Sequence, residues 1–312
     1  MTRTQHTSHE IDVAAPADVV HAVIADAEAW PRRFAPTLHV ERAELAPGAE
    51  RLRIWARANG EVKHWTSRRD LDAGLRRIRF RQEVSSPPVA SMAGEWRVTE
   101  RPGGATLTLT HEFTAVDDDP KGIEWITEAT DRNSRTELGN IKDLAERWSQ
   151  LADLEFEFED SVLVAAPLET VHDFLHDAAA WPARLPHVAR LDLREEAGGI
   201  QHMAMDTRTA DGSEHTTESV RICFPGADIA YKQLRTPSMM AAHTGRWSFE
   251  QTEHGVRVSS WHAVVLNPEA IPAVLGPDAT TATARRFIRE AAGGNSRATL
   301  GLAKRFAEER HG

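Results

Sequence analysis

The tetrapeptide VAAP at Val13–Pro16 occurs a second time at Val164–Pro167, 151 residues further along the chain. The same spacing relates five more pairs: Trp30-Pro31 and Trp181-Pro182, Gln82 and Gln233, Gly94 and Gly245, Trp96 and Trp247, and His111 and His262. One shared dipeptide is chance, but this many matches in one register indicate an internal duplication. We therefore expect two tandem domains, residues 1–151 and residues 152–312.

The spacing changes near the end of each copy. Asn133-Ser134-Arg135 reappears as Asn295-Ser296-Arg297, now 162 residues later. The second copy therefore contains about eleven additional residues, which fall within Asn267–Thr283. We expect the Asn-Ser-Arg segments to lie in the last helix of each copy, where a structural contact to the sheet is their simplest role.

Both copies show the same order of predicted elements. Pro16 suits the first turn of a helix, and a short helix at Ala29–Ala35 contains Trp30-Pro31. A long helix with an apolar stripe, about Lys121–Gln150, closes the first copy. Alternating polarity predicts strands at His9–Ala15, Arg51–Arg57, Val62–Leu71, Arg76–Gln82, Ser91–Thr99 and Thr106–Phe113. We expect an α+β fold in which a curved antiparallel sheet of about seven strands wraps around the C-terminal helix and encloses a cavity.

Composition excludes several classes of function. Of the 312 residues, 41% are hydrophobic and 27% charged, and the formal net charge of −10 argues against nucleic acid as the main partner. The N-terminus lacks the apolar core of a signal peptide, and no apolar run approaches the ~20 residues of a membrane span. Cys223 is the single cysteine, and neither a metal-binding histidine motif nor a phosphate-binding glycine loop is present. We expect a cytoplasmic protein without metal, cofactor or membrane partner.

One predicted strand directs an arginine into the cavity. In Val62–Leu71 the face that holds Trp65, Ser67 and Arg69 also holds Leu71, so this face should point inward. A buried guanidinium is costly unless it is paired or hydrogen-bonded. Arg69 is therefore either a structural partner of a carboxylate or a donor to an anionic or enolate oxygen of a ligand.

The corresponding arginine of the second copy is ambiguous. If the turn Asn59-Gly60 matches Asp211-Gly212, the spacing becomes 152 and Arg221 corresponds to Arg69. The apolar set Val220, Ile222 and Phe224, however, would turn Arg221 outward. We keep Arg221 as a candidate catalytic residue.

Three histidines lie on predicted inward faces. His111 shares its face with Leu109 and Phe113, and His262 with Val258 and Val264. His243 has no counterpart in the first copy, where Met92 stands. Each can exchange a proton near neutral pH, and each can equally be a hydrogen-bonded core residue.

Aromatic and amide side chains are candidates for substrate binding. Indole rings give flat walls that suit a planar, conjugated ligand, although such residues are often simple core. Glutamine adds hydrogen-bonding capacity to an otherwise apolar wall. The candidates are Trp65, Trp96, Trp247, Trp30, Phe34, Gln82 and Gln233.

Taken together, these motifs resemble one family. VxAP before a helix, Ala-Trp-Pro after it, the inward Trp-x-Ser-x-Arg strand (Trp65, Ser67, Arg69) and the Asn-Ser-Arg helix are similar to the polyketide aromatase/cyclases. These enzymes belong to the Bet v 1/START-like (SRPBCC) helix-grip superfamily. The resemblance covers nearly the whole chain twice, as in the di-domain members.

The resemblance implies a cofactor-independent aldol cyclization and dehydration of a poly-β-ketone. The chain would be bound to an acyl carrier protein, within a type II polyketide synthase, and closure would join C7 and C12 of a reduced chain. Arg69 would polarise a ketone, Ser67 and His111 would shuttle protons, and the indoles would hold the chain bent.

The second copy departs from this pattern. Thr217 stands in place of Trp65, and Leu185 in place of Phe34. We therefore expect the first copy to be better equipped for the aldol step, and the second to use His243 and His262 for dehydration or only to shape the assembly. Two alternatives remain: a carrier of lipid, sterol or quinone without chemistry, and a helix-grip module that acts through its outer surface.

Overall fold

The computed structural model describes residues 3–58, 60–208 and 214–311 of the chain. The chain divides into two compact units, Met1–Gln150 and Leu151–Gly312. Of the two turns compared above, Asn59 and the Asp211-Gly212 pair lie outside the described residues.

The first unit is built on a seven-stranded antiparallel sheet with the order β1-β7-β6-β5-β4-β3-β2. Neighbours along the chain pair as hairpins, and β1 closes the order by pairing with β7. The strands are β1 (Gln5–Val13), β2 (Thr37–Ala46), β3 (Ala49–Ala58), β4 (Glu61–Asp72), β5 (Arg77–Gln82), β6 (Val89–Arg101) and β7 (Gly104–Ala115).

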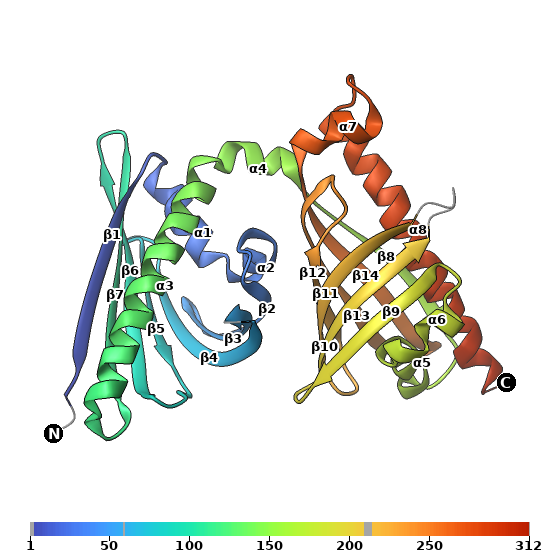
Figure 1. The fold of residues 1–312 in the computed structure, drawn as a ribbon, viewed down its shortest axis with the longest axis horizontal. Coiled ribbons are helices and arrows are strands. Elements are labelled where there is room, and N and C mark those ends of the chain that lie inside the picture. Colours follow the sequence, from blue (N-terminus) through green and yellow to red (C-terminus); the bar gives the residue numbers. More distant parts are fainter. Residues whose placement is uncertain (1–2, 59, 209–213, 312) are drawn as a thin grey trace. The chain divides into compact units, whose positions relative to one another are not determined.

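The second unit repeats this topology with the order β8-β14-β13-β12-β11-β10-β9. In each unit the sheet curves around one long helix, as Figure 1 shows for α3 and α8. The strands are β8 (Glu155–Val164), β9 (Val188–Glu196), β10 (Ile200–Arg208), β11 (Glu214–Cys223), β12 (Ile229–Arg235), β13 (Met240–Thr252) and β14 (Gly255–Leu266).

The helices follow the predicted order with one correction. The long helix of the first unit ends at Glu146 instead of Gln150, and a separate helix, α4, follows it. Among the described residues, no helix is long and apolar enough to cross a membrane. The helices are α1 (Ala17–Ala25), α2 (Trp30–Arg33), α3 (Pro120–Glu146), α4 (Trp148–Leu154), α5 (Leu168–His176), α6 (Trp181–Arg184), α7 (Ile271–Leu275) and α8 (Thr281–Glu309).

Local sequence explains where these helices begin. Pro16 and Pro167 directly precede α1 and α5, where a missing N–H costs nothing. Asp119 caps α3 by accepting a hydrogen bond from the backbone N–H of Gly122, and Thr280 caps α8 in the same way through Thr283. The Asn-Ser-Arg segments lie within α3 and α8, as expected.

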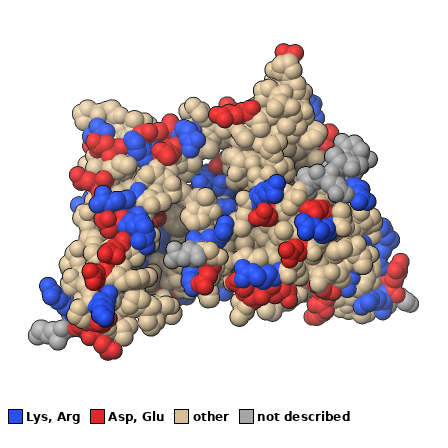
Figure 2. All heavy atoms as spheres, in the orientation of Figure 1, with Lys and Arg blue, Asp and Glu red and all other residues tan. Residues whose placement is uncertain are grey.

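Arginines of the first sheet's outer face are largely neutralised. Arg68 lies 3.3 Å from Asp70, and Glu95 accepts from both Arg79 and Arg97. Figure 2 shows basic and acidic side chains interspersed on the visible face. These arginines and their carboxylate partners therefore form a solvated face of the sheet with local ion pairs.

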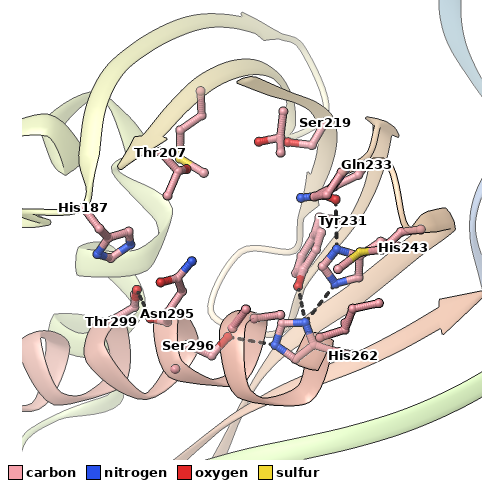
Figure 3. A pocket seen from close by; sticks show the side chains of 18 of the residues that line it. His187, Thr207, Ser219, Tyr231, Gln233, His243, His262, Asn295, Ser296 and Thr299 are labelled. Carbon is pink, nitrogen blue, oxygen red and sulfur yellow. Dashed lines mark hydrogen bonds between the residues drawn. The ribbon is translucent and has the colours of Figure 1, made fainter. Parts of the chain in front are cut away.

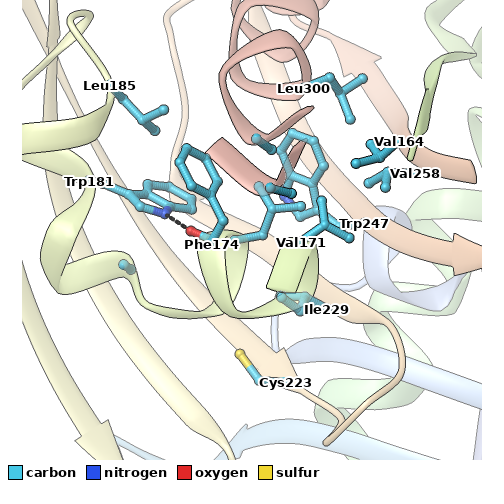
Figure 4. Close-up of a cluster of buried hydrophobic side chains, with 14 of the residues drawn as sticks. Val164, Val171, Phe174, Trp181, Leu185, Cys223, Ile229, Trp247, Val258 and Leu300 are labelled. Carbon is cyan, nitrogen blue, oxygen red and sulfur yellow. Dashed lines mark hydrogen bonds between the residues drawn. The ribbon is translucent and has the colours of Figure 1, made fainter. Parts of the chain in front are cut away.

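The second unit has two apolar clusters beside α8. One contains Trp181, Trp247 and Leu300, and Figure 4 shows these side chains packed with Phe174 from α5. The other contains Met240, Ile271 and Ile288. Leu300 and Ile288 are twelve residues apart on one helix, about 18 Å at 1.5 Å per residue. The two clusters thus lie toward opposite ends of α8.

Candidate functional site

A cavity of about 740 Å³ lies inside the second unit, between the sheet and α8. Polar and titratable residues of its lining are labelled in Figure 3. Apolar and polar side chains alternate around it, which suits a ligand with both alkyl and oxygen-bearing parts. Its lining includes Trp181, Met203, Thr217, Ser219, Arg221, Tyr231, Gln233, Met240, His243, Trp247, His262, Val274, Phe287, Asn295, Ser296 and Thr299.

Arg221 is the buried charged group of this cavity, and Glu290, which is exposed, also lines it. It points inward and is only 2% exposed, which resolves the ambiguity of its strand. One terminal nitrogen donates to the carbonyl of Leu175 at 2.5 Å, the other approaches the sulfur of Met203 at 3.7 Å, and Nε has no partner. The indole of Trp181 lies 4.8 Å from the guanidinium carbon. Among the described residues, no carboxylate forms an ion pair with Arg221.

Strand register explains why Arg221 lacks a counterion. Glu50 of β3 is the cross-strand partner of Arg69, and Gln201 of β10 is the cross-strand partner of Arg221. The Gln201 amide donates instead to the carbonyl of His176 at 3.2 Å and to Glu195 at 2.6 Å. Burial lowers the pKa of Arg221, yet a guanidinium remains charged at any physiological pH. The cavity of the second unit therefore holds a buried cation that still has an N–H donor without an acceptor.

A hydrogen-bonded chain of side chains crosses the same cavity (Figure 3). Gln233 Oε1 lies 2.9 Å from His243 Nδ1, and His243 Nε2 lies 2.9 Å from His262 Nδ1. His262 Nε2 contacts Ser296 Oγ at 2.8 Å and Ser260 Oγ at 3.0 Å. Tyr231 Oη also approaches His262 Nδ1, at 3.0 Å. Strands β12, β13 and β14 and helix α8 thus contribute to one chain.

This chain has a direction when both rings are neutral. With Gln233 in the orientation of the structure, its amide oxygen accepts, so His243 Nδ1 bears the proton. His243 Nε2 then accepts from His262 Nδ1–H, and His262 Nε2 accepts from a serine hydroxyl. A proton entering at the serine end can therefore be passed toward Gln233 without a large movement.

Burial determines the protonation of these groups. It lowers the pKa of His243 to about 3, with a further contribution from His262. It lowers the pKa of His262 to about 4 and raises the pKa of Tyr231. Near neutral pH both imidazoles are therefore neutral bases and the phenol keeps its proton.

The first unit places its candidate residues differently. Arg69 faces inward, as expected, but its Nε donates to Glu50 at 2.8 Å and its terminal nitrogens donate to the carbonyls of Ile24 and Ala25 at 2.8 and 2.7 Å. Nη2 of Arg69 donates a second hydrogen bond to the same Glu50 oxygen and completes a buried ion pair. Its donors thus tie the end of α1 to the sheet, which is the structural alternative raised for this residue.

Neighbours of Arg69 in the first unit also have packing partners. Ser67 is buried and donates to the Arg81 carbonyl at 3.3 Å. Trp65 and Trp30 pack on one apolar cluster, and the Trp30 indole donates to the Val23 carbonyl at 3.2 Å. Phe34 meets Trp30 edge-on with ring centroids 6.3 Å apart.

The remaining candidates of this unit lie on β5, β6 and β7. His111 is half-buried, meets the Phe80 ring edge-on at 5.5 Å, and has a pKa that burial lowers to about 4. Trp96 is 5% exposed, and Gln82 accepts from Ser85 at 3.4 Å. His111 Nδ1 and the hydroxyl of Ser134 are buried without hydrogen-bond partners, whereas their repeat counterparts His262 and Ser296 bond to each other.

Sequence reasoning did not assign Tyr231 or Ser296 to the site. Tyr231 is the only tyrosine of the chain and stands at the repeat position of Phe80, a signal that was present. Ser296 was expected to make a structural contact to the sheet. Its hydroxyl does contact the sheet, at His262 of β14, and there it also joins the hydrogen-bonded chain. Its neighbour Arg297 contacts the sheet through Asp160 at 3.2 Å.

Comparison with known proteins agrees with this architecture. The family model described as polyketide cyclase/dehydrase and lipid transport matches the chain twice, at residues 4–146 and 155–305. The chain belongs to this family. The predicted resemblance and the prediction of two tandem helix-grip domains are both confirmed.

Relatives of the polyketide cyclase/dehydrase family match over the full length. The granaticin polyketide synthase bifunctional cyclase/dehydratase of Streptomyces violaceoruber is 44% identical over 98% of this chain and 95% of its own. The actinorhodin polyketide synthase bifunctional cyclase/dehydratase of Streptomyces coelicolor is 42% identical over 94% of this chain and 93% of its own.

Solved structures that match nearly the whole chain are also di-domain proteins. The di-domain ARO/CYC BexL from the BE-7585A biosynthetic pathway is 50% identical, with a TM-score of 0.87 over 97% of this chain and 99% of that one. The di-domain ARO/CYC StfQ from the steffimycin pathway is 35% identical, also with a TM-score of 0.87, over 98% and 99%. The family description includes lipid transport, so membership by itself leaves the carrier alternative open.

Proposed function

We propose that this chain is an aromatase/cyclase that closes and dehydrates the first ring of a poly-β-ketone, and that the cavity of residues 152–312 performs the chemistry. The observation that carries the proposal is the unsaturated guanidinium of Arg221 in the same cavity as the His243–His262 chain. A passive lipid carrier gains nothing from a buried, unpaired cation, whose desolvation is costly. This assignment reverses the expectation that the first copy is the better equipped.

Ring closure needs an enolate and a polarised ketone. A neutral imidazole, His262 or His243, removes a proton from a CH2 group between two carbonyls, and the negative charge develops on a ketone oxygen. Arg221 donates to that oxygen, and Ser219 and Tyr231 lie in the same wall. The enolate carbon then forms a bond to a second carbonyl carbon, whose oxygen takes up the proton held by the imidazolium.

Dehydration uses the same side chains to remove one proton from carbon and to deliver one proton to the hydroxyl. A neutral imidazole removes a proton from the carbon next to the new hydroxyl and becomes an imidazolium. The hydroxyl then takes a proton from this imidazolium, directly or through the Tyr231 phenol, which the imidazolium reprotonates, and leaves as water as the C=C bond forms. Protons removed and delivered balance, so the hydrogen-bonded chain ends as it began. Trp181 and Trp247 offer flat surfaces to the planar ring that forms.

The position of ring closure, the carrier of the substrate and the cellular location are proposed from the family resemblance. We propose closure between C7 and C12 of a reduced chain that is delivered on an acyl carrier protein, within a type II polyketide synthase in the cytoplasm. We propose that no metal or organic cofactor takes part, because each step is a proton transfer or an addition that Arg221 and the imidazoles can assist. In the first domain Arg69, Ser67, Trp65 and His111 then have supporting roles.

Arginine variants test the proposal. In an assay that reconstitutes the minimal polyketide synthase with this protein, Arg221→Ala should lower formation of the aromatic product on the order of 10²-fold, the loss typical of removing a donor to a developing oxyanion. Arg221→Lys should recover part of the activity. The matched control is Arg69→Ala, which removes an equally buried guanidinium and should reduce stability but not turnover by the folded protein. Wild-type product levels with Arg221→Ala would defeat the proposal.

A further inference from the structure

The additional residues of the second copy form a distinct segment at one end of the cavity. In the first domain a short turn, Val116–Asp118, leads from β7 almost directly into α3. In the second domain Pro268–Ala270 and α7 intervene between β14 and α8. We call residues 267–280 the insertion. Figure 1 shows α7 beside the N-terminal end of α8.

The insertion is attached firmly to the domain. The backbone N–H of Asn267 donates to the Met239 carbonyl at 2.8 Å, and its side-chain amide donates to the Ser238 carbonyl at 3.0 Å. Ile271 is 3% exposed and packs in the apolar cluster with Met240 and Ile288. The segment is therefore a fixed wall of the cavity.

Two apolar side chains at this end of the cavity, one from the insertion and one from α8, remain half-exposed. Val274 of α7 is 46% exposed and Phe287 of α8 is 45% exposed, and both line the cavity together with Met239 and Met240. Large apolar side chains that line a cavity without being packed by the protein are available to an apolar part of a ligand. The exposed Trp125 holds the repeat position of Phe287 in the first domain, where no insertion accompanies it.

The buried polar groups lie toward the other end of the same cavity, whereas Glu290, an exposed carboxylate of its lining, lies on α8 near Phe287. Arg221 contacts Trp181 and Met203, which belong to the apolar cluster around Leu300. Ser296, which bonds to His262, lies between Leu300 and Phe287 along α8. From Phe287 to Thr299 the helix rises about 18 Å. A ligand that spans the cavity thus meets a cation first, the imidazoles next, and an apolar wall last.

We propose that the insertion is a specificity subsite that receives the alkyl end of the acyl chain, the part that does not enter the new ring. This inference rests on the proposed function, because it takes Arg221 as the place of the reacting diketone. The wall fixes how much chain lies beyond the imidazoles, and so it selects which carbonyl pair comes to Arg221. Chains whose alkyl end is too short to reach Val274 and Phe287 lose this contact.

A homologous series of 2,4-diketones, from pentane-2,4-dione to dodecane-2,4-dione, tests the subsite by calorimetric titration of the full-length protein. Burial of one CH2 group contributes about 0.8 kcal/mol, so each methylene added once the tail reaches Val274 and Phe287 should tighten binding up to about fourfold. In Val274→Asp, and in Phe287→Ala as a second variant, the longer tails should lose this gain while pentane-2,4-dione binds as in wild type. The control is Leu163→Asp, a comparably exposed position of the same domain that does not line the cavity.

The outcomes separate the subsite from the proposed function. If tail length has no effect on wild type, or if both cavity variants retain the wild-type series, the subsite is wrong. Arg221→Ala should weaken every diketone by the same factor and leave the gain per methylene unchanged. If Arg221→Ala has no effect while Val274→Asp abolishes the gain, the subsite stands and the proposed catalytic assignment fails.

Discussion

At the scale of single residues, one side chain distinguishes the two buried arginines. Glu50 saturates Arg69, whereas Gln201 at the matching strand position leaves Arg221 with two partners and a free Nε. Both guanidiniums are almost completely buried, so neither can recover its hydration from bulk water. The available donors of Arg221 therefore follow from the absence of one carboxylate.

Gln201→Glu should install that missing counterion. The new carboxylate faces Arg221 across the β10–β11 pair and competes with substrate oxygen for its donors, so activity should fall on the order of 10²-fold. Product analysis with the reconstituted synthase measures this. Glu50→Gln is the matched change in the first domain: it should destabilise that domain, on the order of 3 kcal/mol, without lowering turnover by folded protein. Undiminished activity of Gln201→Glu would mean that Arg221 does not act on substrate.

A second matched pair tests the imidazoles. His262→Asn removes the residue that links Ser296, Tyr231 and His243, so product formation should drop about 10²–10⁴-fold, the range for a lost general base. His111→Asn alters the repeat counterpart, whose Nδ1 has no partner, and should leave turnover within a few-fold of wild type. Equal losses in the two variants would argue that both domains react with substrate.

At the scale of elements, two glycines allow neighbouring strands to carry large side chains inward. Gly245 of β13 is the cross-strand partner of Tyr231, and a Cβ there would overlap the Tyr231 ring and approach the Trp261 carbonyl to 2.7 Å. Gly94 of β6 is the partner of Phe80 in the same way. The Gly94–Gly245 match seen in the sequence thus has a steric cause.

Replacing either glycine by alanine should distinguish a loss of domain stability from a loss of catalytic activity. Gly245→Ala and Gly94→Ala should each destabilise their own domain by about 1–3 kcal/mol, because a strand or an aromatic ring must shift. Only Gly245→Ala displaces Tyr231 from His262, so only this variant should also lose activity per folded molecule. Circular dichroism during thermal unfolding and product assays on the same samples provide both readings. A Gly94→Ala protein that is equally inactive would contradict this interpretation.

The fold was accessible to sequence reasoning because it depends on local, repeated signals. Two occurrences of VAAP, of Trp-Pro and of the paired glycines define both the duplication and its register. The direction of the Arg221 side chain was harder to predict, because Val220 and Ile222 on the other face of β11 are as buried as Arg221 itself. Alternation of polarity carries no information when both faces of a strand are buried.

The site could not be predicted fully, because it depends on strand register and on long-range hydrogen bonds that a single sequence does not show. Met205 pairs with Thr217 just as Ile54 pairs with Trp65, which confirms the 152-residue spacing for β11. To recognise that Gln201 faces Arg221 as Glu50 faces Arg69, one needs the 151-residue spacing for β10 as well as the 152-residue spacing for β11. The hydrogen bond between Ser296 and His262 joins residues 34 positions apart, from a helix and a strand, and no periodicity connects them.

At the scale of the whole molecule, the two domains share a topology but divide their polar interiors differently. The first uses Arg69 and Glu50 for attachment of α1 and keeps His111 without a partner for Nδ1. The second connects Gln233, two histidines and Ser296 across its cavity. Duplication thus supplied a second sheet-and-helix scaffold in which buried polar groups could be arranged for a ligand.

Both domains should lose stability as the pH falls, through their buried histidines. In the folded chain the pKa is lowered to about 4 for His111 and His262 and to about 3 for His243, from an ordinary value of 6.5. Above pH 6.5 these rings are neutral in both the folded and the unfolded states and contribute no pH dependence. Below it the unfolded chain binds more protons, so the free energy of unfolding should decrease from pH 6.5 down to about pH 4.

Hydrogen exchange read by mass spectrometry can follow each domain separately across this range. His111→Asn should flatten the decrease in peptides of β6 and β7, and a His243→Asn/His262→Asn double variant should flatten it in β13 and β14. Asp131 provides an internal reference, because its pKa is lowered to about 2 by Arg135 and then His9, so its contribution is lost only below about pH 4. If the wild-type slope between pH 6.5 and 4 survives in both variants, these histidines are not the groups that titrate on unfolding. The neutral-base role assigned to His243 and His262 would then lose its electrostatic basis.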